Sequence, residues 1–212
     1  MARKISESTI RRLSLYLRFL EEFEERGIET LSSEELAGRG STTAAQVRKD
    51  LSLFGSFGKR GLGYSVQELS ATLRRLLGLD RPWRVALVGA GRIGSALFAY
   101  DDFRRRGFRI VSVLDSDPGK IGTQWGDVRI QDEARLEQVL AEEKVDIVIL
   151  AVPGDAAQHV VERVVSSGVR AVLNFAPTKL HVPGQVALRD VNMSMELEAL
   201  SFALAADDGP GA

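Results

Sequence analysis

Hydrophobic positions recur at helical spacing at both ends of the first eighty residues. Apolar residues stand three or four positions apart from Ile10 to Leu20, which predicts a helix over residues 6–26. The leucines of residues 69–77 repeat this spacing and predict a second helix. Together these helices bracket a predicted N-terminal domain, residues 1–78.

Two short helices are predicted between them. Ser32, with Glu35 three positions later, forms a capping box that starts a helix ahead of the turn GRGS. Thr43 and Gln46 repeat that spacing and start a helix that extends to about Phe54. Two short helices joined by a glycine-containing turn are typical of a helix-turn-helix.

The next stretch, GSFGKRGLGYSV at residues 55–66, is rich in glycine. Leu62, Tyr64 and Val66 alternate as they would in a strand. We therefore expect a small β-hairpin here, which would make the N-terminal domain a winged helix-turn-helix.

From residue 79 onward the pattern changes to apolar runs alternating with amphipathic segments. The apolar runs cover residues 84–88, 108–114, 145–152, 169–175 and 186–191, and helical segments at 133–144 and 154–167 separate three of them. Alternation of this kind predicts an α/β fold with a doubly wound parallel sheet, a Rossmann domain over residues 79–191.

The first of these strands runs into a glycine fingerprint, VGAGRIG. Gly89 would permit the tight turn, Gly91 would let the backbone approach a pyrophosphate, and Gly94 would let the helix pack on the strand. The free N–H groups of the helix would then hold the phosphates. The alternative is that the glycines form only a tight turn.

Asp115 ends the second strand, 21 residues after Gly94. A carboxylate there would accept hydrogen bonds from an adenosine ribose and repel a 2′-phosphate, which favours NAD(H) over NADP(H). Ligands bind beyond the carboxyl ends of such strands. The predicted cofactor-binding residues are therefore Gly89, Ala90, Gly91, Arg92, Ile93, Gly94, Asp115, Pro153, Ala176 and Pro177.

The last helical segment, residues 192–206, is apolar on two sides. Met193, Leu197, Leu200 and Leu204 form one stripe, and a second stripe includes Phe202. A helix of this kind needs two surfaces to bury against. We favour insertion into a partner subunit over packing between the chain's own domains, and expect residues 207–212 to be a disordered tail.

Charge adds a second indication of function. The net charge of −1 combines 13 Lys/Arg against 10 Asp/Glu in residues 1–78 with 15 against 19 in residues 79–212. Residues 39–60 hold five basic side chains and one acidic one. A basic patch on a helix-turn-helix predicts contact with DNA. The predicted contact residues are Thr42, Thr43, Gln46, Arg48 and Lys49 near the second helix, and Lys59 and Arg60 at the wing tip. The alternative is a solvated basic face.

Other classes are disfavoured by composition. The chain has no cysteine and no apolar run near the roughly 20 residues that span a bilayer, so we expect no disulfide, no metal site, no membrane contact and a cytoplasmic location. No tyrosine has a lysine four residues later, and neither His159 nor His181 has an evident partner. We therefore expect a nucleotide-sensing protein and no enzyme. A nicotinamide-dependent oxidoreductase, a CoA-binding domain and a Rossmann domain serving only as a dimer scaffold remain open.

Three segments together resemble the Rex family of redox-sensing repressors. They are TTAAQVRKDLSLFGSFGKRGLGYSV, VGAGRIGSALFAY and VLNFAPTKLHVPGQVALRDVNMSMELEAL, and the resemblance extends from about residue 5 to 206. It implies a homodimer with a swapped C-terminal helix, and NADH and NAD⁺ as ligands. It also implies repression of respiratory and fermentation genes from palindromic operator DNA, with release at high NADH.

The resemblance also assigns a redox switch. It implies that Arg18, Tyr100 and Asp190 form this switch, with Tyr100 close to the nicotinamide and so among the cofactor-binding residues. Asp190 would pair with Arg18 in one state and with Tyr100 in the other. The chain departs from the family pattern at Leu53 and Arg92.

Overall fold

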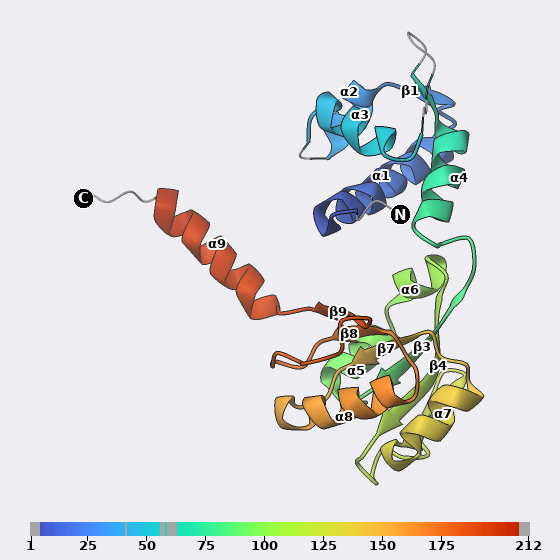
Figure 1. Ribbon diagram of the computed structural model, residues 1–212, viewed down its shortest axis with the longest axis vertical. Coiled ribbons are helices and arrows are strands. Elements are labelled where there is room, and N and C mark those ends of the chain that lie inside the picture. Colours follow the sequence, from blue (N-terminus) through green and yellow to red (C-terminus); the bar gives the residue numbers. More distant parts are fainter. Residues whose placement is uncertain (1–4, 41, 56–57, 59–62, 208–212) are drawn as a thin grey trace. The chain divides into compact units, whose positions relative to one another are not determined.

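The computed structural model describes residues 5–40, 42–55, 58 and 63–207. The chain divides after Arg81 into two compact units, each with its own hydrophobic core (Figure 1). The predicted class is confirmed: a helical N-terminal unit precedes a unit built on a mostly parallel sheet. Among the described residues, no helix is long and apolar enough to cross a bilayer.

Four helices make up most of the N-terminal unit. They are α1 (Glu7–Glu25), α2 (Ser33–Arg39), α3 (Ala44–Ser52) and α4 (Val66–Leu76). Each begins at a residue whose side-chain hydroxyl accepts a hydrogen bond from the backbone N–H three residues later. These N-cap residues are Ser6, Ser32, Thr43 and Ser65 respectively. Buried leucines of α1 and α4 form the core, and α2 and α3 form the predicted helix-turn-helix.

The described strand of the expected wing has a partner that was not predicted. Strand β2 (Tyr64–Ser65) pairs antiparallel with β1 (Thr30–Leu31), which precedes the two short helices. A Cβ on Gly63 would lie 2.3 Å from the carbonyl oxygen of Leu31, so only glycine permits this approach. Half of the expected hairpin, including Leu62, lies outside the described residues, so the hairpin itself stays a prediction.

The second unit is built on a seven-stranded sheet of order β5-β6-β4-β3-β7-β8-β9, in which only β5 and β6 pair antiparallel. The strands are β3 (Trp83–Val88), β4 (Phe108–Asp115), β5 (Gln124–Trp125), β6 (Val128–Asp132), β7 (Ile147–Leu150), β8 (Ala171–Asn174) and β9 (Ala187–Asp190). Strands β5 and β6 were not predicted from the sequence.

Helices cover both faces of this sheet (Figure 1). They are α5 (Arg92–Phe98), α6 (Asp101–Arg105), α7 (Leu136–Glu142) and α8 (Gly154–Ser166), and a short 3₁₀ turn (Glu133–Arg135) precedes α7. Ala86 and Val88 face the core under α7 and α8, whereas Val85 and Leu87 face the core under α5 and α6. The alternation of side chains along β3 therefore gives the sheet two buried faces.

The strand register defines a carboxyl edge and an amino edge of the sheet, where the parallel strands end and begin. Val88, Leu150, Asn174 and Asp190 lie in line across β3, β7, β8 and β9, at the carboxyl ends of the strands. Phe108 lies at the opposite edge, where β4 begins beside β3. These two edges hold different groups of candidate residues.

Helix α9 (Met193–Asp207) follows β9 and extends one residue beyond its predicted end. Its large apolar side chains are 60–76% exposed: Met193, Met195, Leu197, Leu200, Phe202 and Leu204. Both predicted stripes therefore lack a surface to bury against within the described chain.

Candidate functional site

A cavity of about 620 Å³ lies at the carboxyl edge of the sheet. It is lined by the fingerprint turn, the end of β4 and the segment between β7 and α8, which follows from the parallel order of these strands. Among the predicted cofactor residues, those that line it are Gly89, Gly91, Arg92, Ile93, Asp115 and Pro153.

Each fingerprint glycine has a separate steric reason. Gly89 has φ +102°, and a Cβ there would lie 2.4 Å from the carbonyl oxygen of Ala151. A Cβ on Gly94 would lie 2.0 Å from the carbonyl oxygen of Gly89. A Cβ on Gly91 would meet nothing within 4 Å, so the space above this backbone is open to a ligand. Gly91 is also the N-cap of α5 and provides no capping side chain.

Asp115 is buried beside this turn, and both of its carboxylate oxygens accept hydrogen bonds from the chain. Its Oδ2 accepts the N–H of Ala90 at 2.6 Å and its Oδ1 accepts the N–H of Asp117 at 2.8 Å. The ammonium of Lys120 lies 3.2 Å from Oδ2 and 3.3 Å from Oδ1. Burial raises the pKa of Asp115, but the two N–H donors and Lys120 outweigh it and the pKa lies below its ordinary value.

Several lining residues were not predicted from the sequence. They are Ser116, Asp117, Lys120, Glu133, Ala151, Val152 and Ala156. Lys120 had a detectable signal, because it is the one basic residue in the turn SDPGK that follows Asp115. The rest lie at strand and helix ends whose place at this edge depends on the sheet order.

Pro177 lies beside the cavity and does not line it. The position of a Cβ on Gly154, the first residue of α8, would be 3.8 Å from Cγ of Pro177 and 3.6 Å from Cβ of Thr178. Ala176 is buried and donates its N–H to the side chain of Asn174 at 2.9 Å. Residues 176–178 therefore form a loop next to the mouth of the cavity, at the end of β8.

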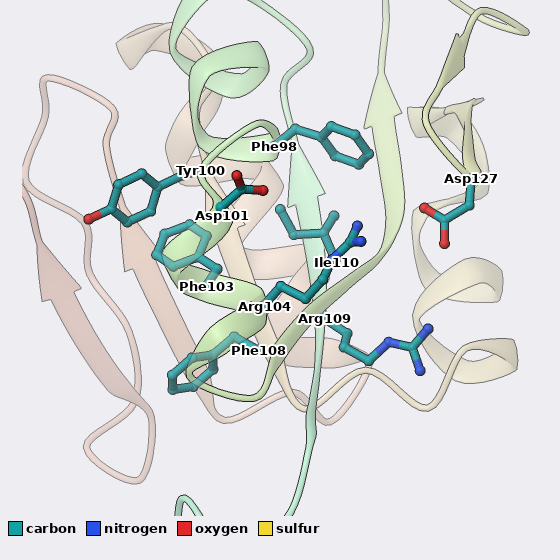
Figure 2. Close-up of a pocket in the computed structure, with 9 residues that line it drawn as sticks. All are labelled: Phe98, Tyr100, Asp101, Phe103, Arg104, Phe108, Arg109, Ile110 and Asp127. Atoms are coloured by element: carbon teal, nitrogen blue, oxygen red, sulfur yellow. The ribbon is translucent and has the colours of Figure 1, made fainter. Parts of the chain in front are cut away.

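Tyr100 does not lie at this cavity. It lines a separate pocket of about 320 Å³ with Phe98, Phe103 and the start of β4 (Figure 2). Tyr100 is 54% exposed, and its ring meets the ring of Phe103 edge-on, with centroids 5.1 Å apart. Because β4 begins at this pocket, Tyr100 lies near the amino edge of the sheet.

Asp190 lies at the carboxyl edge and is exposed. One of its oxygens, Oδ1, accepts a hydrogen bond of 2.8 Å from the amide of Asn174, which is itself 1% exposed. The sequence analysis had no reason to single out Asn174.

The candidate DNA interface lies on α3 and the turn before it. Thr43 caps the helix, Gln46 donates to Asp50, and Arg48 donates to Ser33 at 2.7 Å and to Glu34 at 3.2 Å. Among the other predicted contacts, Lys49 is exposed and Thr42 is partly exposed. Lys59 and Arg60 lie outside the described residues.

Asp50, 1% exposed, ties this helix to α1. Its carboxylate accepts from Arg12 Nε at 2.6 Å, from Arg12 Nη2 at 2.8 Å and from the hydroxyl of Tyr16 at 3.0 Å. Gln46 adds a fourth donor at 2.8 Å. Helix α3, the candidate recognition helix, is thus held through a buried charge. Arg18 lies on the same α1.

Comparison with known proteins agrees with this two-part organisation. Residues 4–52 match the family model described as "Putative DNA-binding protein N-terminus", and residues 80–178 match the one described as "CoA binding domain". The fold and the two sites therefore define a DNA-binding protein with a nucleotide-binding Rossmann-like domain.

Full-length relatives make the assignment specific. The chain is 48% identical to the redox-sensing transcriptional repressor Rex of Pelotomaculum thermopropionicum, over 96% of this chain and 95% of the relative. It is 48% identical to that of Carboxydothermus hydrogenoformans, over 96% and 98%. The chain belongs to the Rex family of redox-sensing transcriptional repressors. These relatives are named as repressors, as the sequence analysis predicted, and not as enzymes.

Solved structures give the same result. The chain resembles RSP, a Rex-family repressor, with 37% identity over 96% of this chain and 95% of that one, and a TM-score of 0.88. It resembles RSP in complex with NAD⁺ and operator DNA with 38% identity over 96% and 94%, and a TM-score of 0.92. A further structure of RSP contains NADH.

Proposed function

We propose that this protein binds palindromic operator DNA as a homodimer when NADH is low, and that NADH binding releases it. The observation that carries the proposal is the cavity beside the glycine turn, joined in one chain to a helix-turn-helix unit. The complexes of RSP with NADH, and with NAD⁺ and operator DNA, support both ligands. Such a protein would act in the cytoplasm.

The charge at the cavity supports NAD(H) as the ligand. Gly91 leaves room for a pyrophosphate, and Arg92 adds a positive charge at the start of α5. Asp115 remains ionised at neutral pH and disfavours a 2′-phosphate. The residues proposed to hold the coenzyme are those that line this cavity, together with the 176–178 loop.

Two features support a homodimer. The first is α9, whose apolar side chains are exposed on both stripes. The second is the separation of the switch residues. Phe108, in the Tyr100 pocket, and Asp190 lie at opposite edges of the sheet and four strands apart, on the order of 25 Å by strand geometry. A hydrogen bond between Tyr100 and Asp190 therefore requires two copies of the chain.

The proposed switch turns a coenzyme difference into a change of partner for Asp190. NAD⁺ and NADH differ by one positive charge at the nicotinamide. We propose that NADH favours the pair of Asp190 with the other subunit's tyrosine at position 100, and that the link of Asp190 to Arg18 then breaks. The spacing of the two recognition helices would change, and with it the fit to half-sites one helical turn apart, about 34–36 Å.

Because residues 80–178 match a family model named for CoA binding, a CoA-binding protein is the second candidate. A CoA-binding domain of this type would also present a glycine turn to phosphates. The buried carboxylate of Asp115 supports the nicotinamide dinucleotide, because it lines the cavity at the end of β4, where a carboxylate can accept hydrogen bonds from a ribose diol.

A gel shift on palindromic DNA tests the proposal. We expect a retarded complex without nucleotide and with NAD⁺, and its loss as NADH is added. Affinity should fall steeply with salt concentration because bound phosphates release counterions. Equal operator occupancy with NAD⁺ and NADH, both at saturating concentration, would contradict the proposed function.

A further inference from the structure

The amide of Asn174 makes three hydrogen bonds at the carboxyl edge of the sheet. Its Nδ2 donates to the carbonyl oxygen of Thr178 at 3.1 Å and to Oδ1 of Asp190 at 2.8 Å. Its Oδ1 accepts the N–H of Ala176 at 2.9 Å. Two acceptors on one side and a donor on the other fit one orientation of the amide, so the side chain is fixed.

Burial makes these contacts costly to lose. Asn174 is 1% exposed, and the N–H of Ala176 has its partner in this amide. A buried polar group left without a partner costs about 1–3 kcal/mol. The amide is therefore a rigid link between the 176–178 loop and the carboxylate of Asp190.

We propose that Asn174 is the positioning residue that sets the carboxylate of Asp190 for the coenzyme-dependent switch. The inference rests on the proposed function, since it gives Asn174 a role only through Asp190. The amide of Asn174 donates to Oδ1 of Asp190 and leaves Oδ2 of Asp190 for a further partner. Because an amide carries no net charge, it orients the carboxylate without replacing a guanidinium as its counter-ion.

The same link gives the cavity a route to Asp190. Pro177 and Thr178 lie against the start of α8, directly after Pro153, which lines the cavity. A coenzyme that shifts the 176–178 loop moves two of the three partners of Asn174. The third partner, Asp190, then shifts with the amide.

The test measures directly the coupling between NADH binding and operator binding. For each variant, the NADH dissociation constant is determined by NADH fluorescence for free protein and for protein saturated with an operator duplex selected on the wild type. The ratio of the two constants equals the factor by which NADH weakens DNA binding. Absolute affinities are thereby separated from communication between the two sites.

We expect a wild-type ratio well above one. In Asn174→Ala and Asn174→Asp the ratio should fall to within about threefold of one, as in Asp190→Ala. Asn174→Asp preserves the side-chain volume and the acceptor for Ala176, so it serves if the alanine variant fails to fold. The matched control is Gln158→Ala, because Gln158 bonds the backbone N–H and carbonyl of His181 and makes no described contact with Asp190.

Three results are decisive. Asn174 variants that bind NADH and DNA with the wild-type ratio would overturn the inference and leave the proposed function intact. An equal loss in Gln158→Ala would also overturn it, because general tethering of the 176–186 segment would then explain the effect. A wild-type ratio of one would instead reject the proposed function itself.

Discussion

Buried carboxylates define both sites at the scale of single residues. Asp50 and Asp115 are nearly inaccessible to solvent, and each collects several donors. Burial raises the pKa of Asp50, but the hydrogen bonds from Arg12, Gln46 and Tyr16 outweigh it and the pKa lies below the ordinary value of 3.8. Each unit thus holds a buried, ionised carboxylate that is stabilised by the donors around it. A neutral side chain in its place would not pair with the neighbouring cation.

Substitution of Asp50 should destabilise the N-terminal unit in a pH-dependent way. Asp50→Asn removes the anionic partner of Arg12, and we expect a loss of about 2 kcal/mol at neutral pH. A depressed folded-state pKa gives stability that is present above the unfolded-state pKa and is lost as pH falls through the folded-state value. Urea unfolding followed by far-ultraviolet circular dichroism should show wild-type stability falling below about pH 4, with a flatter acid limb in the variant.

Glu34→Gln is the matched control, because Glu34 also pairs with an arginine but is exposed. It should leave the stability close to that of the wild type, because an exposed ion pair is screened by solvent. Equal losses of stability in the two variants would show that the buried ion pair of Asp50 contributes no more than the exposed ion pair of Glu34.

Asp115 separates the two nucleotide candidates. Asp115→Ala removes the acceptor proposed for the ribose diol, and hydrogen bonds to charged groups are worth about 1.5–3 kcal/mol, so NADH affinity should fall about 10- to 100-fold. Isothermal titration should show no matching loss for CoA. Asp127→Ala, at the Tyr100 pocket, is the control and should bind NADH as the wild type does. An unchanged NADH affinity in Asp115→Ala would contradict the proposed ribose contact and favour the CoA-binding alternative.

A residue's role could be predicted from the sequence when that role depends on the chain close to it, and not when it depends on contacts between distant segments. The fingerprint glycines were identifiable because the turn itself requires them. The partners of Asp50 were not, because Arg12 and Tyr16 stand 38 and 34 residues away and meet it only through tertiary packing. Asn174 was hidden for the same reason, since its contact with Asp190 depends on the pairing of β8 with β9.

At the scale of elements, capping and periodicity were reliable guides. The two short helices α2 and α3 begin after the predicted capping residues, Ser32 and Thr43. Strand pairing was harder to predict: the two-residue strand at Tyr64 joins one that precedes the helix-turn-helix, and the short β5 and β6 were missed. Short strands gain their stability from neighbours, so their own residues carry little signal.

Helix α9 should control the oligomeric state. Leu200→Asp with Phe202→Asp places a charge on each apolar stripe, and we expect the dimer to shift to monomer, with operator affinity falling at least tenfold. Light scattering coupled to size-exclusion chromatography measures the mass. Glu198→Gln, on the same helix, should remain dimeric. A double variant that stays dimeric would move the interface away from α9.

The whole molecule joins two units for which different ligands are proposed. The N-terminal unit carries the recognition helix and Arg18, and the sheet unit carries the cavity, Tyr100 and Asp190. The class and its two parts could be predicted from the order of motifs along the chain. The division of the sheet unit into two separate edges could not, because it follows from strand order and register.

That division has a genetic consequence. We expect that a chain with Tyr100→Phe, expressed on its own, binds DNA without responding to NADH. The same holds for a chain with Asp190→Ala. Mixed in one cell, they would form heterodimers in which one of the two tyrosine–aspartate pairs is whole and the other lacks both members. Two defective alleles would therefore complement each other in part, whereas a chain carrying both substitutions would rescue neither.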